Sequence, residues 1–233
     1  MQIQEWQNNW NELGKNDPLW VVLTDPAKKG GRWTPAEFFA TGVEEISGLM
    51  GRVDQVKPNL RRGKALDFGC GVGRLSQALA AHFPEVHGVD ISPSMVGHAN
   101  RFNRFPDRCH FHVNGSDRLE LFPDASFDFI YSNIVLQHIE PQFSKRYIAE
   151  FVRLLKPDGL LVFQILSATL FRQILPPILV ERYRRLKNRG KPYIGMFGVP
   201  RTEVLEILRR AGGKVLACES RPESSRWTSR RFF

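Results

Sequence analysis

Apolar and polar positions follow two alternating patterns along this chain, and together they predict strands separated by helices. Short apolar runs bounded by turn residues predict buried strands at 65–68, 86–90, 109–113, 127–132 and 160–165. Apolar residues at helical spacing, such as Leu75, Ala78 and Leu79, predict a helix after the first strand, and helices recur between the later strands. Near the end, a turn at 222–225 separates two further predicted strands, 214–219 and 226–233. This order of elements predicts an α/β fold.

Residues 1–60 precede the first predicted core strand, and their tryptophans indicate an ordered segment that packs on a surface. A helix start is predicted at Thr34-Pro35-Ala36-Glu37, where a capping hydroxyl is followed by proline at the first helical position and by an acid at the third. The helix is expected to run from Pro35 to about Gly51. We therefore expect an N-terminal helical extension, 1–60, beside a main domain, 61–233.

The stretch 65–80 carries the strongest candidate chemistry. It predicts a strand, then a turn with glycine at every second position (Gly69, Gly71 and Gly73), then a helix. Glycines let a backbone approach a ligand closely, and the free N–H groups of a helix start favour a nucleotide-like ligand. The dinucleotide fingerprint G-x-G-x-x-G requires a third glycine at position 74, which is Arg74, so an NAD-dependent oxidoreductase is disfavoured.

With Asp67 two residues before the first glycine, this stretch resembles the first motif of the class I S-adenosylmethionine-dependent methyltransferases. The resemblance extends over 64–165 and includes the Phe127-Asp128 pair and the Lys-Pro-x-Gly turn at 156–159. It implies a Rossmann-like, doubly wound sheet of seven strands, mostly parallel with an antiparallel C-terminal strand. It also implies an enzyme with S-adenosyl-L-methionine as cofactor.

The resemblance and the strand ends together select the candidate cofactor-binding residues. An acid at the carboxyl end of the second strand can accept hydrogen bonds from vicinal ribose hydroxyls, which is the role expected of Asp90. The family places an acid such as Asp67 near the methionyl end of the cofactor. It places a polar residue after the third strand near the adenine, and Ser116 and Asp117 are the candidates here; the alternative for Asp117 is a solvated loop acid. The full set is Asp67, Gly69, Gly71, Gly73, Asp90, Ile91 against the adenine face, Ser116, Asp117 and Asn133.

His138 is the candidate catalytic residue, because it follows the fourth strand at the edge where open α/β sheets place their ligands. A histidine there can act as a general base on an acceptor hydroxyl. The equally weighted alternative is a structural cap. The expected reaction is O-methylation of a small-molecule acceptor without a metal ion, since the three cysteines contain no C-x-x-C pair. In the family an N-terminal segment often closes over the ligands, so Trp33, Phe38 and Phe39 are candidates for that cover. The alternative is that these residues are hydrophobic anchors for the extension.

The formal net charge of +9 is concentrated in one insert, predicted at about 167–199. Seven cations and one acid lie between positions 172 and 191. Such a run is often a solvated face, but beside apolar residues it can also bind an anionic substrate or an anionic membrane surface. The alternative function is an RNA methyltransferase or a non-catalytic RNA-binding protein that uses this basic face. Because no apolar run approaches 18 residues and the start is polar, we expect a soluble, cytoplasmic protein.

Overall fold

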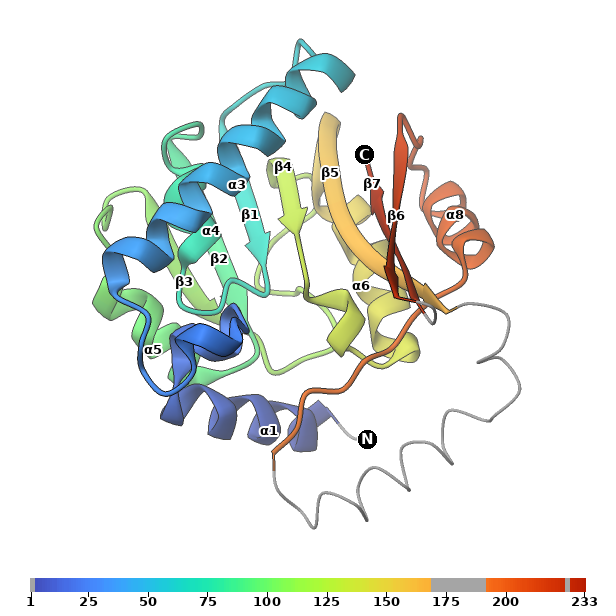
Figure 1. The fold of residues 1–233 in the computed structure, drawn as a ribbon. Helices are drawn as coiled ribbons and strands as arrows, with labels where there is room; N and C mark the ends of the chain where they lie inside the picture. Colours follow the sequence, from blue (N-terminus) through green and yellow to red (C-terminus); the bar gives the residue numbers. More distant parts are fainter. Residues whose placement is uncertain (1–2, 169–191, 225–226) are drawn as a thin grey trace.

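The computed structural model describes residues 3–168, 192–224 and 227–233, which form a sheet with helices on both faces (Figure 1). The sheet has seven strands in the order β3-β2-β1-β4-β5-β7-β6. β7 is antiparallel to both of its neighbours, and the other adjacent pairs are parallel. The fold class predicted from the sequence is therefore confirmed. The strands are β1 (Lys64–Phe68), β2 (Glu85–Asp90), β3 (Cys109–Val113), β4 (Phe127–Ser132), β5 (Leu155–Ala168), β6 (Cys218–Ser224) and β7 (Trp227–Phe232).

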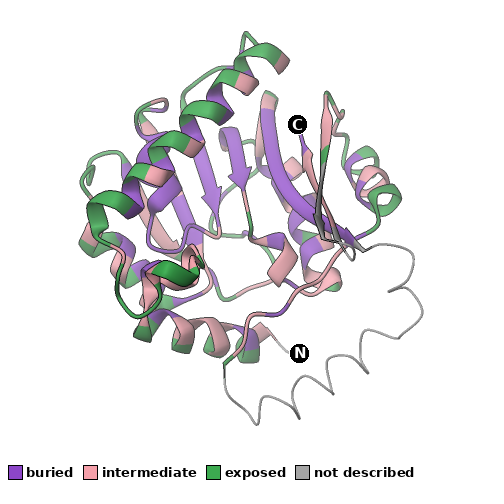
Figure 2. Cartoon of the chain, viewed as in Figure 1, coloured by how far each residue is buried: buried purple, intermediate pink, exposed green. Residues whose placement is uncertain are grey.

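The helices cover the two faces of the sheet in separate groups. Buried side chains of α3 and α4 form one apolar cluster with the strands, and those of α6 and α8 form another on the opposite face. Figure 2 shows the consequence, a central sheet that is buried along most of its length between partly exposed helices. The helices are α1 (Ile3–Asn16), α2 (Pro18–Val22), η1 (Pro26–Lys28), α3 (Pro35–Val56), α4 (Arg74–Leu79), α5 (Pro93–Phe102), η2 (Leu136–His138), α6 (Pro141–Leu154) and α8 (Arg201–Arg210).

The predicted helix start in the N-terminal extension is confirmed. The Thr34 side chain accepts a hydrogen bond from the Glu37 backbone N–H, and the Glu37 carboxylate accepts one from the Thr34 backbone, so both halves of a capping box are present. The helix is longer than predicted and ends at Val56 rather than near Gly51. Val53 explains the extra turn, since it is fully buried and continues the apolar face of α3 against the sheet.

Two predicted boundaries near the fifth strand and the C-terminus are wrong. β5 begins at Leu155 rather than at 160, so the predicted turn at 156–159 lies within the strand. The turn shifts the register there, because Leu155 pairs with Phe127 but Leu160 pairs with Phe129. β6 begins at Cys218 rather than at 214, and it continues through the predicted turn to Ser224. The preceding residues bond instead to the chain end, where Leu216 N–H donates to the Phe233 carbonyl.

The N-terminal helices reach the edge of the sheet where the parallel strands end. In Figure 1, α1 crosses below the arrowheads of the parallel strands, and the segment 192–200 begins next to α1 and rises away from it toward α8. Asn9 holds these two segments together, since its side-chain amide both donates to the Tyr193 carbonyl and accepts from the Tyr193 N–H, each at 3.0 Å. This edge of the sheet is therefore covered by two segments that lie far apart in the sequence.

Candidate active site

A cavity of about 370 Å³ lies at the carboxyl ends of the parallel strands, under α1 and α2. Its size is in the range of pockets that hold small molecules and cofactors. Its walls are mostly apolar and carry a few polar groups. The lining residues are Trp6, Trp10, Val21, Val22, Thr24, Phe68, Gly69, Cys70, Gly71, Arg74, Leu75, Val89, Asp90, Ile91, Met95, Asn114, Asn133, Ile134, Val135, Gln137, His138, Ile139, Tyr147, Ile194 and Met196.

The glycine turn after β1 forms one wall of this cavity. Gly69 and Gly71 have φ values of 76° and 52°, in the left-handed region that glycine adopts without strain. A Cβ atom on Gly71 would lie 2.7 Å from Val22 Cγ2, so the turn also allows the N-terminal segment to approach. Gly73 is left-handed as well, but it faces Phe111 rather than the cavity lining. Its predicted cofactor contact stays a prediction.

Asp90 lies at the end of β2 and lines the cavity. Its two carboxylate oxygens accept the Gly71 N–H at 2.9 Å and the Ser92 N–H at 2.8 Å. Burial raises the pKa of Asp90, and these backbone N–H groups oppose that rise. Each carboxylate oxygen retains further lone-pair capacity that ligand hydroxyls can use. Ile91 follows in the same wall and is held by Gln7, whose amide donates to the Ile91 carbonyl at 3.0 Å.

Asp67 does not line the cavity, although the sequence predicts a cofactor contact there. Its side chain is 1% exposed and accepts a 2.6 Å hydrogen bond from the Ser76 hydroxyl. Burial raises the pKa of Asp67 to about 7, against the opposing effects of Ser76 and of the Arg74 guanidinium. In this structure the carboxyl group therefore packs behind the glycine turn, and its predicted contact with a cofactor stays a prediction.

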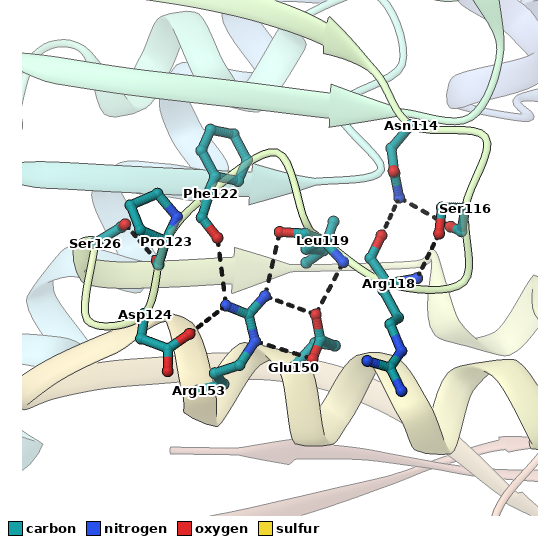
Figure 3. Close-up of polar contacts among 10 residues, drawn as sticks. All are labelled: Asn114, Ser116, Arg118, Leu119, Phe122, Pro123, Asp124, Ser126, Glu150 and Arg153. Carbon is teal, nitrogen blue, oxygen red and sulfur yellow. Dashed lines mark hydrogen bonds and ion pairs between the residues drawn. The ribbon is translucent and has the colours of Figure 1, made fainter.

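After β3 the structure brings Asn114, rather than Ser116 or Asp117, to the cavity. The Asn114 backbone N–H donates to the Asp90 carbonyl, and its side-chain amide donates to the carbonyls of Ser116 and Arg118 (Figure 3). Asp117 faces away and pairs with Arg146. Asn114 was not among the residues predicted from the sequence, although it directly follows the third predicted strand, at the edge where open α/β sheets place their ligands.

The loop that carries Asn114 is fixed to α6 by charged side chains (Figure 3). Arg153 donates to the carbonyls of Leu119 and Phe122 and pairs with Asp124 and Glu150. The Glu150 carboxylate in turn accepts the Leu119 N–H at 2.9 Å. Because several loop carbonyls are satisfied in this way, the loop is held in one conformation beside the cavity.

Asn133, after β4, lines the cavity within a polar network that reaches α3. Its amide donates to Glu45 Oε1 at 2.7 Å, and the Tyr131 hydroxyl donates to the same oxygen at 2.9 Å. The other Glu45 oxygen lies 2.8 Å from the Arg74 guanidinium, a group only 5% exposed. Arg74, the residue that breaks the dinucleotide pattern, is therefore a buried cation at the cavity wall whose charge is balanced by Glu45.

His138 also lines the cavity, and its hydrogen bonds define its tautomer. Nδ1 lies 2.7 Å from the Gly195 carbonyl, which can only accept, so Nδ1 carries the proton. Nε2 lies 3.1 Å from the Gln137 amide nitrogen and is the acceptor there. The Trp10 ring packs edge-on against the imidazole at 5.7 Å. Burial lowers the pKa of His138, so the neutral ring with a lone pair on Nε2 is the form held at the cavity.

The aromatic residues that cover the cavity are not the candidates named from the sequence. Trp33, Phe38 and Phe39 belong to a separate apolar cluster and do not line the cavity, which agrees with the alternative that they anchor the extension rather than cover the ligands. Trp6 and Trp10 of α1 line it instead. Of the predicted insert, 169–191 lie outside the described residues, and with them the basic run proposed to contact anionic membranes. Ile194 and Met196, from its described end, line the cavity.

The described residues also bear on the expected metal and membrane contacts. Within 3–168, 192–224 and 227–233, no cluster of histidine, cysteine, aspartate and glutamate is suited to holding a metal ion. Within the same ranges no helix is both long enough and apolar enough to traverse a lipid bilayer.

Comparison with known proteins gives a family match and several methyltransferase relatives. Residues 66–163 match the family described as Methyltransferase domain. The malonyl-[acyl-carrier protein] O-methyltransferase of Herminiimonas arsenicoxydans is 28% identical over 183 residues, covering 76% of this chain and 61% of that protein. The ubiquinone biosynthesis O-methyltransferase of Coxiella burnetii (strain Dugway 5J108-111) is 35% identical over 182 residues, covering 77% and 64%. The chain thus spans less than two thirds of the length of either relative.

A solved structure shares the whole fold. The magnesium protoporphyrin IX methyltransferase of Synechocystis PCC 6803 with bound SAH superposes with a TM-score of 0.65 at 18% identity, covering 100% of this chain and 98% of that one. At this identity the likeness concerns the fold alone. The family suggested by the glycine turn is confirmed.

Proposed function

Because this chain belongs to the class I S-adenosylmethionine-dependent methyltransferases, we propose that it transfers a methyl group to a hydroxyl of a small-molecule acceptor. Its cofactor is S-adenosyl-L-methionine. Two relatives whose printed names specify O-methylation support an oxygen acceptor. The RNA-binding alternative has no such support, since it relies on the basic run 172–191 and the relatives named above are not RNA enzymes.

The residues at the cavity fit this cofactor. Asp90 presents carboxylate lone pairs beyond those used by Gly71 and Ser92, and these suit a pair of ribose hydroxyls. Ile91 supplies an apolar surface beside it for a flat base. Gly71 carries no side chain, so its backbone at the cavity wall can lie close to a ligand. The single observation that carries the proposal is Asp90, held by two backbone N–H groups with its carboxylate at the cavity.

The chain must also align the acceptor and remove its proton. When bound, S-adenosylmethionine supplies an electrophilic methyl carbon, and the acceptor oxygen bonds to it as the carbon–sulfur bond breaks and its electrons pass to sulfur. His138 Nε2 receives the hydroxyl proton, since Nδ1–H is already committed to Gly195. An acceptor hydroxyl takes the place of the Gln137 amide at Nε2. Trp6 and Trp10 exclude water from this side of the cavity.

Calorimetric titration of the purified protein tests the cofactor half of the proposal. We expect S-adenosylmethionine and S-adenosylhomocysteine to bind in the micromolar range, which is typical of enzyme ligands, and NAD not to bind. Absence of binding for both adenosyl compounds would overturn the proposal.

His138→Gln tests the base. We expect transfer of labelled methyl groups to hydroxylated small molecules to fall by about 10²- to 10⁴-fold, the usual contribution of general base catalysis, while S-adenosylhomocysteine affinity is retained. Since burial lowers the pKa of His138 below 6.5, the rate of the parent enzyme should decline only as the pH falls below about 6.5. An unchanged rate in His138→Gln would leave the histidine as a structural cap.

A further inference from the structure

A second cavity, of about 240 Å³, adjoins the cofactor cavity. The two cavities share four lining residues, Asn133, Ile134, Gln137 and Met196, so a molecule in one lies against a molecule in the other. The remaining lining comes from the C-terminal half of the sheet, namely Gln164, Leu166, Glu219, Ser229 and Arg231. Under the proposed function this second cavity is the place for the acceptor.

Arg231 is the uncompensated charge of this cavity. The strand register places it directly between Gln164 of β5 and Glu219 of β6. Glu219 is engaged elsewhere, since its carboxylate lies 2.7 Å from the Arg52 guanidinium. Across the part of the chain that the structure describes, the Arg231 guanidinium forms no hydrogen bond and no ion pair, although it is half-buried.

The other charged groups near Arg231 are already neutralised. Arg231 acts electrostatically on Tyr131, whose hydroxyl donates to Glu45. Glu45 itself is balanced by the buried Arg74. With Glu219 paired to Arg52 and Glu45 paired to Arg74, the positive charge of Arg231 remains at the cavity. An anionic group of a ligand would pair with it.

The hydrogen bonds of Ser229 point to the same ligand group. Its hydroxyl oxygen accepts the Gln164 amide at 2.9 Å, which leaves the hydroxyl proton available to a ligand. A guanidinium beside a hydroxyl donor matches the planar carboxylate, which arginine binds through two parallel hydrogen bonds. The single remaining positive charge of Arg231 balances a monoanion such as a carboxylate, but not a dianion such as phosphate. Ile134, Leu166 and Met196 provide apolar contact for a short carbon skeleton.

We propose that the acceptor is a hydroxylated carboxylic acid whose carboxylate binds Arg231 and the Ser229 hydroxyl. This inference rests on the proposed function, since it assumes that S-adenosylmethionine bound in the first cavity supplies the methyl group. The carboxylate lies at the sheet end of the second cavity. The acceptor hydroxyl reaches past Asn133 and Gln137, the polar residues common to both cavities, toward His138. Arg231 is thus a specificity-determining residue.

The test compares an acid with its neutral amide. The complex of the full chain with S-adenosylhomocysteine is titrated calorimetrically with 3,4-dihydroxybenzoate and with 3,4-dihydroxybenzamide as probes. We expect the acid to bind at least about 10-fold more tightly than the amide, as for a charge-assisted pair. Arg231→Gln should abolish the preference and Arg231→Lys should retain part of it, with S-adenosylhomocysteine affinity unchanged in both.

The matched control is Arg210→Gln, which removes one arginine charge from the exposed surface of α8, where Arg210 pairs with Glu206. It should keep the full preference for the acid. A parent protein that binds the acid no better than the amide, or a preference that survives Arg231→Gln, overturns the inference. The preceding titration with S-adenosylhomocysteine reports separately on the proposed function, so failure of one is distinguishable from failure of the other.

Discussion

Glu45 of α3 and Asn133 after β4 are joined by a hydrogen bond of 2.7 Å from the asparagine amide to the glutamate carboxylate. The same carboxylate accepts the Tyr131 hydroxyl and pairs with Arg74 at the start of α4. One side chain of the N-terminal extension therefore ties together the end of β4 and the helix that follows the glycine turn. The extension is part of the site's framework as well as its roof.

Glu45→Ala should destabilise the protein by about 3 kcal/mol or more, because it leaves the buried Arg74 charge without its partner. Denaturant unfolding measures this change in the free energy of unfolding. The matched control is Glu44→Ala, one position earlier in α3, where the side chain is exposed and a change within about 0.5 kcal/mol is expected. Equal effects of the two substitutions would show that the ion pair contributes little.

Asp90→Ala should weaken S-adenosylhomocysteine binding by about 30-fold, since losing hydrogen bonds to a charged group costs about 2 kcal/mol. The substitution also leaves the Gly71 and Ser92 N–H groups without their acceptor, so Asp90→Asn is measured beside it. Calorimetry gives the dissociation constants, with exposed Asp107→Ala as the control. An unchanged constant in Asp90→Ala would remove the ribose assignment.

Gly71→Ala should lower cofactor affinity and thermal stability together. The new methyl group would meet Val22 at 2.7 Å in a left-handed backbone conformation that costs alanine roughly 1–2 kcal/mol. Gly97→Ala is the control, because Gly97 lies in α5 with open space around its Cα and ordinary helical geometry. That substitution should leave affinity unchanged and raise stability slightly. Full affinity in Gly71→Ala would show that the cover can move aside.

Asp67→Asn should stabilise the ligand-free protein above neutral pH. Burial raises the pKa of Asp67 from 3.8 to about 7, so folding favours the protonated carboxyl group. Its stabilising contribution is complete below pH 3.8 and is lost as the pH rises through about 7. The amide does not titrate, so its advantage should grow between pH 4 and 7 and stay constant above. About 1.4 kcal/mol per pKa unit sets an upper limit of about 4 kcal/mol.

Asp128→Asn provides a control of opposite sign for this experiment. Burial raises the pKa of Asp128, but the Lys156 ammonium and the Lys64 N–H more than offset that effect and lower it overall. Its contribution is therefore present above pH 3.8 and lost as the pH falls further, so Asp128→Asn should be destabilising at pH 8. Denaturant unfolding from pH 4.5 to 8 compares both variants with the parent. Parallel curves for the Asp67 variant and the parent would contradict the buried, protonated state.

The predictions from sequence succeeded where a short stretch of chain sets its own conformation. The turn at Gly69 and Gly71, the strand that ends at Asp90 and the helix start at Thr34 each depend on neighbours within a few residues. Which side chains line the cavity was harder to predict, because that depends on contacts between distant segments. For Trp33 the sequence left a cover role and an anchor role open, and only the structure shows that it packs away from the cavity, whereas Asn114 lines the cavity and was not predicted.

The sequence by itself indicated the fold class, because glycine spacing and apolar periodicity report local backbone demands. Through the resemblance carried by the glycine turn it also indicated the family and the cofactor. Tertiary structure alone decided which tryptophans roof the cavity and that Asp67 is bonded to Ser76 behind it. It also brought Arg231, from the last strand, beside the residues that follow β4. The direction of a side chain toward a cavity depends on how segments far apart in sequence pack, and no local pattern contains that information.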